Sequence, residues 1–164
     1  MSSIFDSYDK DVPTTEREAY STVVWKRASQ IFSNCQVFKD GIDPTDILQG
    51  YLGNGYLLTV LSAMSASPES IFDLFETKEV NKAGIYMVYL YVNGVKTPVI
   101  VDDFVPVWPQ NNQPIFAKAV DQELWVVLLE KAWAKLHGTY CRTESSSPFF
   151  AASHFSKSII RFIS

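Results

Sequence analysis

The sequence QGYLGNGYLLTVLSAM, residues 49–64, predicts the central element of the structure. A glycine-rich loop runs here into a segment that is nearly apolar on all sides from Gly55 onward. A helix without a polar face belongs inside a core, so the sequence predicts a buried helix that begins near Gly55. The loop therefore brings the chain to the N-terminus of a central helix.

The same junction has the features of a site for covalent catalysis. A helix N-terminus offers unpaired N–H groups and a positive partial charge, which stabilise an anion and lower the pKa of a thiol placed there. Gln49, a few residues upstream, carries an amide that is suited to stabilising an oxyanion. Gly55 has no side chain, however, so the nucleophile is missing.

Composition limits the class of protein. The chain has 164 residues, of which 47% are apolar and 20% charged, which fits one globular domain and excludes a disordered tail or a fibre. The net charge of −4 gives no basic surface for nucleic acid. Residues 57–66, the longest apolar stretch, fall short of the ~20 residues that a membrane span needs. Residues 1–10 lack a secretory signal, so we expect a cytoplasmic protein.

Two cysteines cannot form a disulfide framework. We expect Cys35 and Cys141 to be thiols in a reducing compartment, although the sequence leaves a single bridge open.

Turn and capping residues divide the rest of the chain into elements. Ser67-Pro68-Glu69 predicts the start of a second helix. Residues 85–92 and 95–101 predict two strands joined at Asn93-Gly94, and Pro98 places the second strand at an edge or a bulge. Residues 104–114 contain three prolines and predict a loop.

A long helix is predicted next, over Gln122–Leu136. We expect Asp121 to cap this helix and Gly138 to end it in a left-handed conformation. Residues 141–164 show no clear period. The order helix, helix, hairpin, helix favours an α+β domain.

Several ordered blocks, spanning roughly residues 25–140, are similar to the calpain family of cysteine proteases. DILQGYLGNGY, residues 46–56, resembles the family signature Asp-Ile-x-Gln-Gly-x-Leu-Gly-Asp-Cys-Trp. VIVDDFVP, residues 99–106, and LLEKAWAKLHGTY, residues 128–140, resemble the Asp-Asp segment and the long helix of the family. The resemblance implies the N-terminal, helical subdomain of a papain-like protease core. It implies three parts: a lead-in over residues 1–24, the core subdomain over 25–140, and a divergent tail over 141–164.

The resemblance also assigns roles to residues of the signature. Gln49 matches the oxyanion-hole glutamine, and Gly55 stands where the family has its nucleophilic cysteine. Asn54 and Tyr56 replace the flanking aspartate and tryptophan. The histidine and asparagine of the family lie in a second subdomain, beyond the part that this sequence matches. Loss of a nucleophile costs on the order of 10⁶-fold in turnover in a triad-type protease, which implies an inactive homologue, a pseudoprotease.

A calcium site is a second implication of the resemblance. It assigns backbone carbonyl donors to Lys39 and Gly41, and side-chain donors to Asp46 and Glu123, with waters completing the shell. The alternative is structural: Asp46 caps a turn, and Glu123 lies in the first turn of a helix.

Other charged and polar residues favour structural roles. We expect Asp102 and Asp103 at a strand end, Glu130 and Lys131 on a solvated or locally paired helix surface, and His137 in the last turn of the long helix. His154 lies in the tail without an asparagine context.

The sequence is compatible with three functions. The first is a pseudoprotease that acts by binding calcium, a calpain-like protein or a second protease subdomain. The second is a truncated piece of a calcium-dependent cysteine endopeptidase. The third is a nonfunctional remnant whose exposed apolar face limits solubility.

Overall fold

The computed structural model describes residues 17–18 and 20–156. Most of the predicted lead-in and the end of the predicted tail, residues 157–164, lie outside this part. The elements in chain order are β1 (Val24–Arg27), α2 (Ala28–Ile31), the 3-10 helix η1 (Pro44–Asp46), β2 (Ile47–Leu48), α3 (Gly55–Ser65), α4 (Pro68–Phe72), β3 (Ile85–Val92), β4 (Val95–Asp102), β5 (Phe104–Val107), β6 (Lys118–Ala119), α5 (Trp125–His137), the 3-10 helix η2 (Cys141–Thr143) and α6 (Pro148–Phe155).

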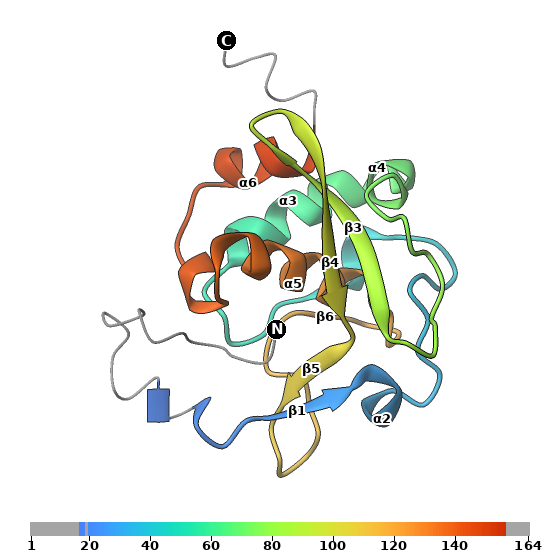
Figure 1. The fold of residues 1–164 in the computed structure, drawn as a ribbon, viewed down its shortest axis with the longest axis vertical. Helices are drawn as coiled ribbons and strands as arrows, with labels where there is room; N and C mark the ends of the chain where they lie inside the picture. The colour runs from blue at the N-terminus through green and yellow to red at the C-terminus, as the bar shows by residue number, and fades with distance from the viewer. Residues whose placement is uncertain (1–16, 19, 157–164) are drawn as a thin grey trace.

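The fold is a mixed α+β arrangement in which α3 and α5 form the centre, as Figure 1 shows. Leu57 and Leu61 of α3 are fully buried, as are Trp125, Leu129 and other residues around α5. The β3–β4 hairpin packs against α5, and α6 packs against α3 and β3. The predicted central helix is thus confirmed, beginning at Gly55. In the described part of the chain, no helix is long and apolar enough to cross a membrane.

The hairpin follows the prediction from sequence. β3 and β4 pair antiparallel from Ile85 opposite Asp102 to Val92 opposite Val95. Asn93 and Gly94 both have positive φ, 50° and 78°, as a two-residue hairpin turn requires. Pro98 lies in a two-stranded sheet, where each strand is an edge and a missing N–H is tolerated.

The segment predicted as a loop over residues 104–114 begins with a strand. β5 pairs antiparallel with β1, so that Trp25 lies opposite Pro106. Proline composition suggested a loop, but a strand in a two-stranded sheet can accommodate a proline on its unpaired side. The distant partner β1 supplies the pairing, which local sequence cannot reveal.

The long helix starts later than predicted. α5 begins at Trp125, and Leu124, not Asp121, is its N-cap. Gln122 has φ 63°, and the backbone around Glu123 pairs with Gln36 across a parallel bridge, which keeps this segment out of the helix. Gly138 ends α5 with φ 102°, as predicted.

Residues 148–155 of the predicted tail form α6. The Ser147 side chain accepts a hydrogen bond from the N–H of Phe149 and so caps the helix. Ala151 and Phe155 are buried in the core next to α3. A helix with so few buried positions has no strong apolar period, which explains why the sequence did not predict it.

The structure corrects the expected position of Lys131 and Glu130, because both are buried. The Lys131 Nζ donates to the Asp102 carboxylate and, at 2.5 Å, to the carbonyl of Phe104, and it lies 5.2 Å from the centre of the Trp25 ring. Burial lowers the pKa of Lys131, and the nearby Asp102 opposes that shift. This ion pair joins α5 to the end of β4, so Asp102 has the strand-end role that the sequence predicted.

Candidate functional site

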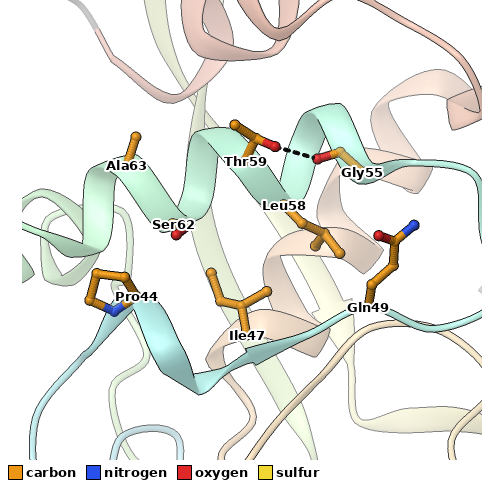
Figure 2. A pocket seen from close by; sticks show the side chains of 8 residues that line it. All are labelled: Pro44, Ile47, Gln49, Gly55, Leu58, Thr59, Ser62 and Ala63. Carbon is orange, nitrogen blue, oxygen red and sulfur yellow. Dashed lines mark hydrogen bonds between the residues drawn. The ribbon is translucent and has the colours of Figure 1, made fainter.

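The start of α3 brings together the two predicted site residues, Gln49 and Gly55. Gly55 is the first residue of α3, and the Gln49 side chain points toward it from the segment that follows β2, as Figure 2 shows. A Cβ on Gly55 would lie 3.5 Å from the Gln49 Oε1 and 3.6 Å from its Nε2, which is ordinary van der Waals contact. The local fold therefore has room for a side chain at position 55, directly beside an amide.

A groove of about 480 Å³ runs from this point along α3. One wall is the exposed face of the helix, and the other is the segment from η1 to Gln49 (Figure 2). The groove is lined by Pro44, Ile47, Gln49, Gly55, Leu58, Thr59, Ser62 and Ala63. Its lining mixes apolar residues with the polar side chains of Thr59 and Ser62, and the Gln49 amide lies at the Gly55 end.

A buried hydrogen bond that the sequence did not predict holds the loop before Gly55. The Asn54 Nδ2 donates to the Glu130 Oε1 at 2.6 Å, and the N–H of Ala117 donates to the Glu130 Oε2 at 3.1 Å. Both Asn54 and Glu130 are buried. Burial raises the pKa of Glu130 to about 7, while its two donors act to lower it. The signal in the sequence that could have identified this buried carboxyl group is a charged residue inside the apolar run of α5.

Tyr56 makes the second link between α3 and α5. Its hydroxyl donates to the carbonyl of Thr143 at 2.7 Å and accepts from the Trp133 Nε1 at 3.0 Å. Burial raises the pKa of Tyr56. The polar groups of Asn54 and Tyr56 thus fix the residues on both sides of Gly55.

Three residues of the predicted calcium site, Lys39, Asp46 and Glu123, interact with one another. The Glu123 carboxylate accepts from the backbone N–H of Lys39 and, at 3.0 Å, from the Trp125 Nε1. Burial raises the pKa of Glu123, and the negative charges of Asp46 and Asp121 raise it further. Two carboxylates therefore repel each other here, and a cation would relieve that repulsion.

The structural alternative for these residues holds in part. Asp46 accepts from the N–H of Asp43 at 2.7 Å within η1, which is a capping contact. Glu123, however, precedes the first turn of α5 and does not lie in it as the alternative expected. Among the described residues, no group of three or more His, Cys, Asp and Glu side chains is arranged to hold a metal, so a site would depend on backbone carbonyls such as those of Lys39 and Gly41.

The other nucleophilic and basic side chains lie outside the groove. Cys35 and Cys141 are free thiols, as expected, and burial raises the pKa of Cys35. The His137 Nδ1 lies 2.9 Å from the Trp133 carbonyl in the last turn of α5, and His154 makes the same contact with Phe150 in α6. None of the four lines the groove at Gly55.

Comparison with known proteins shows the family of the chain. The sequence profile of the calpain family cysteine proteases matches residues 2–164. The chain belongs to the calpain family. It is 37% identical over 123 residues to the calpain-type cysteine protease DEK1 of Zea mays and 33% identical over 122 residues to calpain-8 of Mus musculus.

These matches cover 71% and 72% of the calpain-family chain described here but only 6% and 17% of the two relatives. The chain therefore spans a small part of the length of the curated relatives that it matches.

The buried Glu130 predicts a specific pH dependence of stability. The pKa of this carboxyl group is about 7 in the folded chain and 4.5 in the unfolded one. The folded chain therefore favours the protonated form of Glu130. The contribution of this group to the free energy of unfolding is lost as pH rises from about 4.5 to about 7. Glu130→Gln should remove this loss, which amounts to about 3 kcal/mol. Urea unfolding of both proteins between pH 4.5 and 8 measures the difference.

Glu76→Gln is the matched control, because Glu76 is exposed and accepts from the Tyr89 hydroxyl and not from Asn54 or Ala117. Parallel pH profiles for wild type and Glu130→Gln would show that Glu130 is ionised in the folded chain at all these pH values and would contradict the prediction.

Proposed function

We propose that this chain is a calpain-family protease subdomain that has lost catalysis and acts by binding. The observation that carries the proposal is that residue 55 is a glycine, which has no nucleophilic side chain. Position 55 is the first residue of α3 and lies beside the Gln49 amide, and as a glycine it offers only a hydrogen, which supports the loss of a nucleophile. Losing the nucleophile alone removes on the order of 10⁶-fold in turnover, since a catalytic triad acts as a unit.

Within this proposal, Gln49 occupies the oxyanion position and Gly55 the nucleophile position. The groove beside them runs along α3, where Thr59 and Ala63 are exposed and Leu58 lies buried beneath them. We infer that a second protease subdomain, from another chain or from a continuation of this one, packs on this face. Burial of the apolar lining would supply the driving force for that contact.

The domain division and the location belong to the same proposal. Residues 25–140 form the core subdomain, residues 1–24 a lead-in and residues 141–164 a tail whose helix α6 packs on that core. The two free thiols favour a reducing compartment such as the cytoplasm.

A second candidate function is a fragment of a longer calcium-dependent cysteine endopeptidase. The small share of each relative that the chain spans, 6% and 17%, favours this alternative. Gly55 would still prevent covalent catalysis at this site. The mass of the native protein distinguishes the pseudoprotease from the fragment. A protein made of this sequence alone has a mass of 18.5 kDa, whereas a fragment comes from a protein of greater mass.

Calcium is the ligand that we propose for the acidic site. Asp46 and Glu123 would provide carboxylate oxygens, and Lys39 and Gly41 backbone carbonyls, which are the hard oxygen donors that calcium prefers. The raised pKa of Glu123, caused by burial and by the charge of Asp46, supports the choice of a cation. Calcium would supply no chemistry here beyond fixing the loop before β2 against Glu123.

Peptide hydrolysis tests the loss of catalysis. We expect the chain, mixed with the separately produced second half of a calpain core and calcium, to release no fluorophore from a peptide substrate. Gly55→Cys should restore hydrolysis, because position 55 has room for a side chain beside Gln49. Gly55→Ala is the matched control, since it fills the same space without a thiol. Equal hydrolysis by the wild-type chain and Gly55→Cys would overturn the proposal.

Thermal unfolding tests calcium binding. Calcium at 100 times its Kd should add about 2.7 kcal/mol of stability, which raises the Tm by about 5–10 °C for a chain of this size. Asp46→Asn should reduce the shift, whereas Asp73→Asn, an exposed residue of the loop after α4, should leave it unchanged. No shift at millimolar calcium, or an equal shift with magnesium, would contradict the proposal.

A further inference from the structure

A second groove, of about 470 Å³, lies on the other side of β2 from Gly55. Leu48 lines this groove, whereas its neighbours Ile47 and Gln49 line the groove along α3. Successive side chains of a strand point to opposite faces, so the two grooves are separated by the strand itself. Leu48 stands at the variable position of the calpain signature, and none of the four proposed calcium residues lines this second groove.

Five carboxamide side chains from three separate segments line it. They are Gln30 of α2, Asn111, Asn112 and Gln113 of the loop after β5, and Gln122 before α5. Lys118 of β6 is the charged side chain among the lining residues, and no carboxylate is part of the lining that the structure describes. An amide cluster with one cation and no anion is an unusual surface in a chain whose net charge is −4.

The oxygen of each carboxamide is already used by the protein. Backbone N–H groups of Arg27 and Gln113 donate to Gln30 and Asn111, at 3.0 and 2.9 Å. The Nζ atoms of Lys26 and Lys118 donate to Asn112 and Gln113, at 2.7 and 3.3 Å, and the Ser33 hydroxyl lies 3.5 Å from the Gln122 Oε1.

The NH₂ group of each of these amides has no acceptor within residues 17–18 and 20–156. Each amide is therefore oriented by its oxygen and keeps two N–H donors for a ligand.

Half of the lining residues are apolar: Ile31, Phe32, Leu48, Pro114, Ala119 and Val120. Leu48 is 40% exposed. A ligand that fits both parts carries hydrogen-bond acceptors, preferably anionic ones, next to apolar groups. Main-chain carbonyls and glutamate or aspartate side chains among leucine-like residues supply that combination, and amide and ammonium donors to a carboxylate are stronger than neutral pairs.

We propose that this groove binds an acidic, partly apolar peptide segment of a partner protein. The site is separate from the Gly55 groove, so it does not depend on the loss of catalysis or on calcium. Occupation would place the peptide against Leu48, on the strand that carries Gln49 at its end.

Fluorescence anisotropy with the full chain tests the site. The probe is a labelled octapeptide of alternating glutamate and leucine, compared with octapeptides in which lysine or glutamine replaces every glutamate. We expect the glutamate peptide to bind at least fivefold more tightly than the glutamine peptide, and the lysine peptide to bind most weakly.

Isosteric variants locate the binding. Asn112→Asp and Gln113→Glu keep the oxygens that accept from Lys26 and Lys118, so the fold is preserved, but they replace donors by acceptors. Each should weaken binding of the glutamate peptide by about fivefold or more. Gln110→Glu is the matched control: it makes the same charge change in the same loop but does not line the groove, and we expect it to change the affinity less than twofold.

Equal weakening by Gln110→Glu and Gln113→Glu would overturn the proposal, because it would reduce the effect to overall charge. Equal affinity for the glutamate and lysine peptides, or no binding of either, would overturn it as well.

Discussion

The buried contact between Asn54 and Glu130 is the constraint on which the site depends. A carboxyl group without solvent must find donors inside the protein, and Glu130 finds them in the Asn54 side chain and the backbone of Ala117. These bonds tie the glycine-rich loop to α5 at the residue before Gly55. The start of α3 is thereby held at one place and in one direction, whatever side chain stands at position 55.

The rest of the fold positions α5 so that this contact can form. Lys131, the next residue of the helix, is buried against the Asp102 carboxylate and the Phe104 carbonyl, which ties α5 to the end of the hairpin. Tyr56 and Trp133 add a hydrogen bond between the two central helices. Buried polar groups of this kind specify one arrangement of a core, because any other arrangement leaves a charge or a donor unpaired. The residues on both sides of Gly55 are therefore held by contacts that do not involve a side chain at position 55.

The sequence predicted the elements whose signals are local. The apolar run from Gly55, the Asn93-Gly94 turn and the Gly138 stop needed only neighbouring residues, and the structure contains all three. β5 and the late start of α5 at Trp125 were not predicted, because each depends on a partner far along the chain, β1 in one case and Gln36 in the other.

The candidate site divides in the same way. The pairing of Gln49 with Gly55 followed from the family signature, whereas the burial of Glu130 and Lys131 depends on where the hairpin and the loop meet α5. The amide groove is composed of three distant segments, so no stretch of sequence contains its pattern.

The most direct test of the account is the pKa of a thiol placed at position 55. In Gly55→Cys, the rate of alkylation by iodoacetamide as a function of pH gives this value, and Cys35→Ser and Cys141→Ser in the same chain remove the other thiols. The account predicts a pKa at least about one unit below the ~8.5 of a free cysteine, since the thiolate would lie at the N-terminus of α3 beside the Gln49 amide. A pKa at or above 8.5 would show that the start of α3 does not stabilise an anion and would contradict the account.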